Sequence, residues 1–157
     1  MPLSPVFDSL ARTEFATAIN QSPYLMGVLS SVHLLGLTLI VGSSVITCLR
    51  CFGFLVPERH LSEVMRPAGR AILLGFVISL ATGFPMFAPR AVTASVNFTF
   101  QVKMILLLAA VIFHFTLYRT VTRSGESRPP WLRLTGVLGV ALWFAVAFAG
   151  CVFIVLD

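Results

Sequence analysis

Three ionisable side chains lie inside otherwise apolar stretches of the sequence: His33, Lys103 and His114. An ionisable group inside a bilayer costs free energy, so its presence there marks a candidate functional site. Imidazole is the commonest metal ligand in proteins and titrates near neutral pH, which suits both ligand binding and proton transfer. Together the three residues predict a cofactor-binding or proton-handling site between membrane helices.

The spacing of these residues favours a site near one membrane surface. Lys103 and His114 are separated by almost three whole helical turns, so they share one face and lie roughly 16 Å apart along the axis. Counted from the outer start of its own span, His33 lies about 13 Å deep, Lys103 about 8 Å and His114 about 24 Å. We therefore expect a site in the outer half around His33 and Lys103, which disfavours a haem held between His33 and His114.

Each of these residues also has a plainer interpretation. The Lys103 ammonium could reach the head groups at the outer interface, as lysine side chains often do. His33 and His114 could each hydrogen-bond to a neighbouring helix and serve only to hold the bundle together. Three methionines could add a thioether ligand, although Met more often fills gaps in a core; they are Met26, Met86 and Met104.

The composition shows what must position these side chains. Of 157 residues, 57% are hydrophobic and 11% are charged, whereas roughly a quarter of the residues in soluble domains are charged. The apolar residues form four blocks, each long enough to cross a hydrocarbon core of about 30 Å as a helix. The sequence predicts an all-α integral membrane protein, a bundle of four transmembrane helices over residues 24–49, 69–87, 98–118 and 134–156.

Residues 1–22 differ from the four-helix domain that we expect over residues 23–157. They carry Asp8, Arg12 and Glu14, which does not fit a secretory signal. Ser4-Pro5 is typical of a helix start, and apolar residues then recur at helical spacing. We predict one short amphipathic helix lying in the membrane interface.

The basic residues predict the orientation in the membrane. Four arginines lie around the connection between the first two predicted spans and four around the connection between the last two, against Arg12, Arg90 and Lys103 on the other side. The positive-inside rule then places both connections in the cytoplasm and both termini outside. The eight arginines are Arg50, Arg59, Arg66, Arg70, Arg119, Arg123, Arg128 and Arg133. Because they are dispersed singly along the chain, a nucleic-acid partner is not expected.

Other features favour packing over chemistry. Cys48 and Cys51 form a single C-x-x-C, a weak metal or redox signal, and Cys151 stands alone. His60, in a basic connection, is expected on the surface. Two rows of small residues are suited to close helix contact, within the bundle or with a partner such as a second copy or another membrane protein. These rows are Gly75-Ser79-Gly83 and Ala141-Ala145-Ala149.

Several motifs of the chain, spread over roughly residues 20–123, point to a family. They are His33-Leu-Leu-Gly36, Val41-Gly42, Leu49-Arg50-x-x-Gly53, Thr82-Gly83, and Phe100-x-x-Lys103-Met104 with the later His114. This set resembles an uncharacterised bacterial family of small four-helix membrane proteins, classed as a domain of unknown function. The resemblance implies a multi-pass protein of the bacterial inner membrane. Ser30 stands where members of that family often carry an acidic residue.

More distantly, the same motifs resemble two better-known groups. In HemJ-type protoporphyrinogen oxidases a His in the first span and a Lys and a later His in the third correspond to His33, Lys103 and His114 here. That resemblance implies haem b or porphyrin binding and a redox role, with His33 as the candidate axial ligand of the iron. CopD-like copper-resistance membrane domains share the rhythm, which implies copper as an alternative. A third hypothesis is an accessory subunit without cofactor, whose polar groups only join helices.

Overall fold

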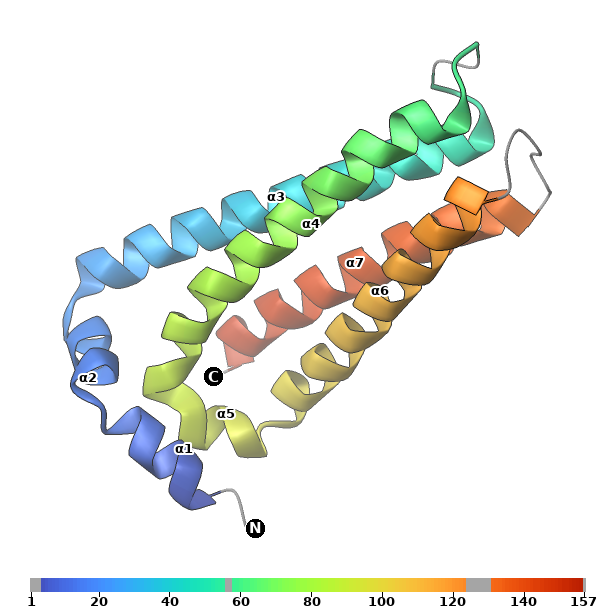
Figure 1. Ribbon diagram of the computed structural model, residues 1–157. Coiled ribbons are helices and arrows are strands. Elements are labelled where there is room, and N and C mark those ends of the chain that lie inside the picture. The colour runs from blue at the N-terminus through green and yellow to red at the C-terminus, as the bar shows by residue number, and fades with distance from the viewer. Residues whose placement is uncertain (1–3, 56–57, 124–130, 157) are drawn as a thin grey trace.

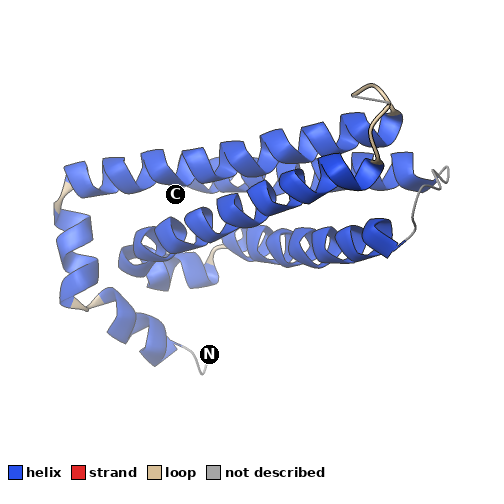
Figure 2. Cartoon of the chain, turned by 45° about the horizontal axis from the view of Figure 1, so that its top comes forward, coloured by secondary structure: helices blue, strands red, loops and turns tan. Residues whose placement is uncertain are grey.

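The computed structural model describes residues 4–55, 58–123 and 131–156, and within these ranges every regular element is helical (Figures 1 and 2). Two short helices, α1 (Ser4–Ala11) and α2 (Glu14–Gln21), precede the long helices α3 (Pro23–Phe52) and α4 (Leu61–Phe87). A 3₁₀ turn η1 (Ala88–Arg90) and α5 (Ala91–Val96) lead to α6 (Phe98–Arg123) and α7 (Trp131–Leu156).

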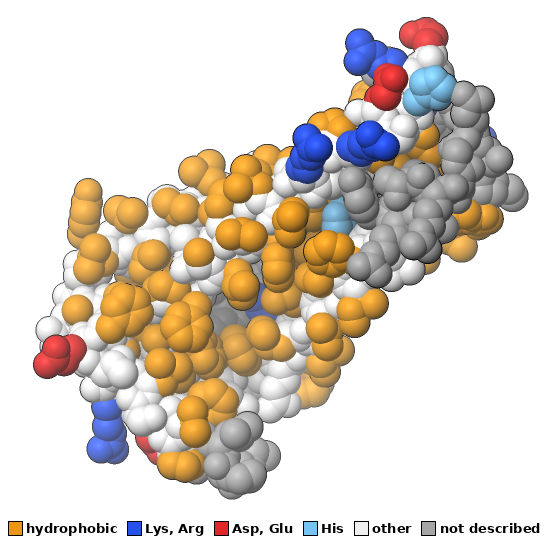
Figure 3. Space-filling model, in the orientation of Figure 1, with side chains coloured by type: hydrophobic (Ala, Val, Ile, Leu, Met, Phe, Trp, Pro, Cys, Tyr) orange, Lys and Arg blue, Asp and Glu red, His pale blue; other side chains and the backbone are white. Residues whose placement is uncertain are grey.

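The predicted fold class is confirmed. In the described part of the chain, four helical stretches are long and apolar enough to cross a membrane, and they are Pro23–Phe52, Leu61–Val96, Phe98–Leu117 and Trp131–Val152. Large apolar side chains such as Leu35, Ile105 and Phe148 are exposed along them. The apolar surface covers most of the face shown in Figure 3, which is the surface that lipid would cover.

Local sequence explains where the first long helix begins and ends. The Ser22 hydroxyl accepts the Leu25 N–H at 3.3 Å, and Pro23 occupies the first turn, where its missing N–H costs nothing. At the other end Gly53 adopts a left-handed conformation with φ of 85°. Glycine takes that conformation without strain, so α3 stops there.

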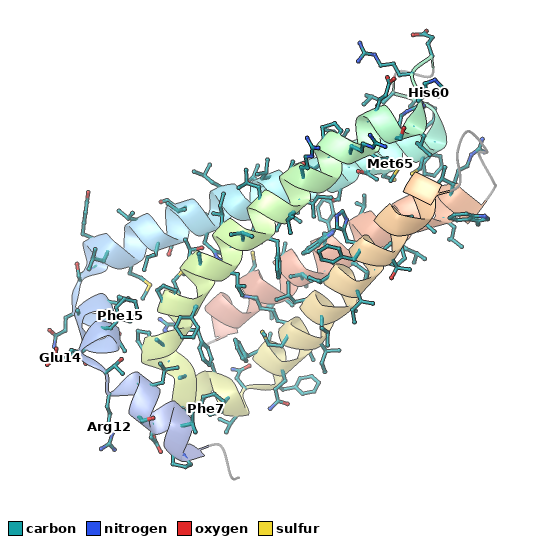
Figure 4. The ribbon with its side chains drawn as sticks, in the orientation of Figure 1. Phe7, Arg12, Glu14, Phe15, His60 and Met65 are labelled. Atoms are coloured by element: carbon teal, nitrogen blue, oxygen red, sulfur yellow. The ribbon has the colours of Figure 1, made fainter. Side chains whose placement is uncertain are left out.

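The prediction of a single N-terminal helix is wrong. Thr13 has an extended backbone and its hydroxyl accepts the Ala16 N–H, so it ends α1 and caps a separate helix α2. The two helices pack on η1 and α5, where Ala16, Ala88 and Ala91 are fully buried. Arg12 and Glu14 point away from the bundle (Figure 4). The segment forms a cap over one end of the bundle, which we call the outer end.

Aromatic rings fasten this cap. Phe7 of α1 meets Phe87 at the end of α4 edge to face, with centroids 6.3 Å apart. Phe87 in turn stacks on Phe100 of α6 at 5.1 Å. Such pairs add about 0.5–1.5 kcal/mol beyond the burial of their area. The three rings therefore join the N-terminal cap to two of the four long helices.

The second long helix is longer than predicted. It begins at Leu61, eight residues before the expected start, and includes both Pro67 and Pro85. Pro85 lies two residues before the end of the helix at Phe87, which is the predicted end, and the chain then tightens into η1. Proline is tolerated inside membrane helices when neighbouring groups satisfy the freed carbonyls.

Each long helix has its own set of neighbours. The helix α3 packs extensively on α4 and on α7, and α6 packs on α7, whereas α4 and α6 touch little. One core joins Ile40, Ile72, Ala110, Trp143 and Val146. A second core lies at the inner end, opposite the cap, and contains Cys51, Leu61, Met65, Leu117 and Leu132.

The closest helix contact is between two glycines. A Cβ on Gly75 of α4 would lie 2.6 Å from the Gly36 carbonyl oxygen of α3, and a Cβ on Gly36 would lie 2.9 Å from the Gly75 carbonyl oxygen. The two backbones therefore touch directly, as at small-residue crossings of membrane helices. The predicted row Gly75-Ser79-Gly83 is thus used inside the chain, against α3.

The other predicted small-residue row packs only in part. Ala149 of α7 is buried but Ala141 is exposed. Residues four apart drift by about 40° around a helix at 3.6 residues per turn, so the ends of such a row face different directions. Close approach on α7 instead occurs at Gly136, where a Cβ would lie 3.1 Å from the Cβ of Cys51.

This geometry makes a prediction about stability. Gly75→Ala should destabilise the protein by roughly 1–3 kcal/mol, because the new methyl group meets backbone that cannot move aside easily. Thermal unfolding of the purified protein in detergent measures the effect. Gly42→Ala is the matched control, since its Cβ would meet nothing within 4 Å. Equal melting temperatures for the two variants would contradict the prediction.

Candidate functional site

The imidazole of His33 is held by a threonine on the neighbouring helix. Its Nδ1 lies 3.0 Å from the Thr82 hydroxyl oxygen. That hydroxyl is 2.7 Å from the carbonyl oxygen of Ile78, one turn earlier in α4. A hydroxyl has one proton, and a carbonyl can only accept. The Thr82 hydroxyl therefore donates its proton to the Ile78 carbonyl, which is also the shorter of the two contacts. Thr82 therefore accepts the Nδ1–H of His33.

This assignment fixes the other ring nitrogen. A neutral imidazole carries one proton, so when Nδ1 is the donor, Nε2 keeps an unprotonated lone pair. The tautomer follows from the hydrogen-bond network, which is the usual basis for placing such a proton. The Nδ1 edge faces α4, because Nδ1 is the ring atom within hydrogen-bond distance of Thr82. In this tautomer Nε2 is the ring atom that can bind a ligand.

Glycine makes room for the ring. A Cβ on Gly83 would lie 3.2 Å from Cε1 of His33 and 3.6 Å from its Nδ1. A larger side chain there would push the imidazole away from Thr82. The pair Thr82-Gly83 therefore acts as a cradle, in which the threonine holds the ring and the glycine admits it.

Lys103 turns into the bundle. Its Nζ lies 3.5 Å from the position of a Cβ on Gly150 of α7, an ordinary van der Waals contact. The side chain is partly buried, and its charge is close enough to His33 to act on the imidazole. Of the two orientations left open by the sequence, the inward one is found. Residues from α3, α4, α6 and α7 thus meet in the outer half of the bundle.

His114 belongs to a different level of the bundle. It lines a cavity with Ile72 of α4, whereas His33 pairs with Thr82, and the ten residues between these positions span about 15 Å of helix. Neither His33 nor Lys103 lines that cavity. The predicted separation of His33 from His114 is confirmed.

Thr82 and Ser79 lie at the candidate site, and the sequence reasoning did not assign them to it. The Ser79 hydroxyl is buried beside Gly36, and among the described residues it has no hydrogen-bond partner. Both residues lie on α4 within the small-residue row 75–83, directly opposite the segment 33–36. The signal was present in that row, because a helix face of small residues admits a neighbouring helix with its polar side chains.

The remaining candidate ligands pack or lie at the surface. Cys51 is buried and Cys48 partly buried, and both touch the position of a Cβ on Gly136. Met104 is 45% exposed on α6. His60 is exposed just before α4, as expected. Within the described ranges, no three His, Cys, Asp or Glu residues are grouped so as to hold a metal ion.

Comparison with known proteins agrees with the sequence motifs. The model of a family of unknown function, DUF6644, matches residues 10–155. The chain belongs to this family. The match covers α2 and all four long helices, so it extends beyond the expected residues 20–123 and includes α7. No curated protein and no solved structure matches the chain, and no likeness to HemJ-type or CopD-like proteins emerges.

The tautomer of His33 is directly testable. Nitrogen-15 NMR of histidine-labelled protein in bilayers should show the His33 ring protonated at Nδ1 and unprotonated at Nε2, because the Thr82 hydroxyl donates its proton to Ile78 and can only accept from the ring. Thr82→Val should remove this preference, whereas Thr82→Ser should retain it. A ring protonated at Nε2 in the unmodified protein would refute the assignment.

Proposed function

We propose that this protein binds haem b or a related porphyrin in the outer half of the bundle and has a redox or electron-transfer role. The observation that carries the proposal is the hydrogen bond from His33 Nδ1 to Thr82, which would leave Nε2 to bind the iron. Histidines that bind metals usually donate their other N–H to a fixed acceptor, which sets the tautomer and the ring orientation.

The charge near His33 suits the same ligand. Lys103 places an ammonium group within electrostatic reach of the imidazole. A charged Lys103 would hold a propionate of the macrocycle, whereas a neutral Lys103 would offer its amine to the iron. His60 lies at the surface, away from Lys103 and His33, so a mutation of His60 can serve as a control for mutations at the outer site.

The surroundings supply an apolar environment. The helices α4 and α6 touch little, and Figure 3 shows a hollow on this face with basic atoms recessed among apolar side chains. Bound haem would supply one-electron chemistry, which the protein tunes through axial ligation, burial and access. His33, Thr82 and Lys103 would then hold and orient the group.

The proposed orientation places this site toward the outside of the cell. The C-terminal ends of α3 and α6 and the N-terminal ends of α4 and α7 lie at the same end of the bundle, opposite the cap (Figure 1). Most of the basic residues lie near these two connections, although Arg128 falls outside the described residues. By the positive-inside rule that end is cytoplasmic, with both termini outside a bacterial inner membrane.

An absorption spectrum tests the function. Protein purified from its membrane, or mixed with haemin, should show a Soret band that shifts on reduction. His33→Ala should abolish the band because the axial ligand is lost, while His60→Ala should leave it unchanged. Circular dichroism of each variant checks that the helices remain folded.

Other results of these measurements would favour a different function. A folded protein with no Soret band, even after haemin addition, would end the haem proposal. Copper found by metal analysis of the same sample would favour the CopD-like alternative. The accessory-subunit alternative predicts that His33→Ala changes stability alone. The row Gly75-Ser79-Gly83 is not available to bind such a partner, because it already packs on α3.

A further inference from the structure

The inner half of the bundle contains a small polar cavity around His114. It measures about 20 Å³ and is lined by residues of all four long helices. Its polar lining comes from Ser44 and Thr47 of α3, His114 of α6 and Thr135 of α7. No charged side chain lines it among the described residues. A second cavity of about 10 Å³ also borders Thr47 and His114.

The three hydroxyl groups that line this cavity each donate a hydrogen bond to a backbone carbonyl. Ser44 donates to the Val41 carbonyl at 2.8 Å, Thr47 to the Ser43 carbonyl at 2.9 Å and Thr135 to the Leu132 carbonyl at 2.8 Å. Each acceptor belongs to the donor's own helix. Because a hydroxyl has a single proton, all three oxygens remain as acceptors toward the cavity.

His114 of α6 is the fourth of these polar side chains. Its ring lies at the edge of Phe115, and the side chain is partly buried. A neutral imidazole has one N–H donor and one acceptor nitrogen. Leaving such groups unsatisfied in an apolar interior would cost about 1–3 kcal/mol each.

We propose that this cavity is a water-binding site, in which one water molecule joins His114 to Ser44 and Thr135. A buried water needs at least about 10–15 Å³ and two to four polar partners, and the larger cavity meets both requirements. The water donates to the hydroxyl oxygens and accepts the N–H of the imidazole.

The smaller cavity borders His114 and Thr47 as well, together with Met65. Met65 belongs to the inner-end core and lies near that end in Figure 4. Among the described residues, His114 is the titratable side chain in both cavity linings, so a water in either cavity would exchange protons with this imidazole.

Water-edited solid-state NMR of the protein in lipid bilayers tests this site. The His114 imidazole, assigned from the signal lost in His114→Gln, should receive magnetisation from water rapidly despite its place within a membrane span. Thr135→Val should slow the transfer about twofold or more, because the water loses one of about three partners. Thr135→Ser, which restores the oxygen, should return the transfer to its original rate.

Thr38→Val is the matched control. Thr38 is exposed on α3 and its hydroxyl also donates to its own helix, at the Leu34 carbonyl, but it does not line either cavity. This variant should leave transfer to His114 unchanged. A His114 ring that receives no more magnetisation than the buried side chain of Ile40, which lines neither cavity, would overturn the proposal, and so would an unchanged rate in a folded Thr135→Val protein.

Discussion

The crossing of Gly36 and Gly75 is the contact on which the rest of the bundle depends. At this crossing two backbones meet without intervening side chains. Lipid is as apolar as leucine, so helices in a bilayer gain little from hiding apolar surface and associate instead through close packing and polar contacts. The glycines supply the packing, and one turn further toward the outer end His33 and Thr82 supply the polar contact.

The antiparallel register set by this crossing explains why the site has its particular members. Gly36 lies opposite Gly75 and Ser79, so His33 must lie opposite Thr82 and Gly83. A shift of α4 by one residue would rotate the threonine away by about 100°. The hydroxyl that orients the imidazole is therefore positioned by a contact that has no polar chemistry of its own.

Much of this architecture could be predicted from the sequence, because a bilayer imposes simple rules. The length of apolar blocks determined the four long helices, and the depth of each residue along its helix separated His33 from His114. The sequence did not show which helices pack against each other, because the apolar faces of the four helices have similar composition. The inward turn of Lys103 depends on Gly150, nearly fifty residues away on another helix. The break at Thr13 was missed because a local capping bond prevailed over a continuous apolar stripe.

The slight contact between α4 and α6 has a consequence for how a ligand would reach the outer site. The other neighbouring pairs of long helices are closed by extensive packing, while this seam faces the apolar surface of the molecule. A flat, largely apolar molecule would come to it sideways, out of the lipid, and not down an aqueous channel. Occupancy would then follow the amount of ligand dissolved in the bilayer. The membrane itself becomes the reservoir from which the protein is loaded.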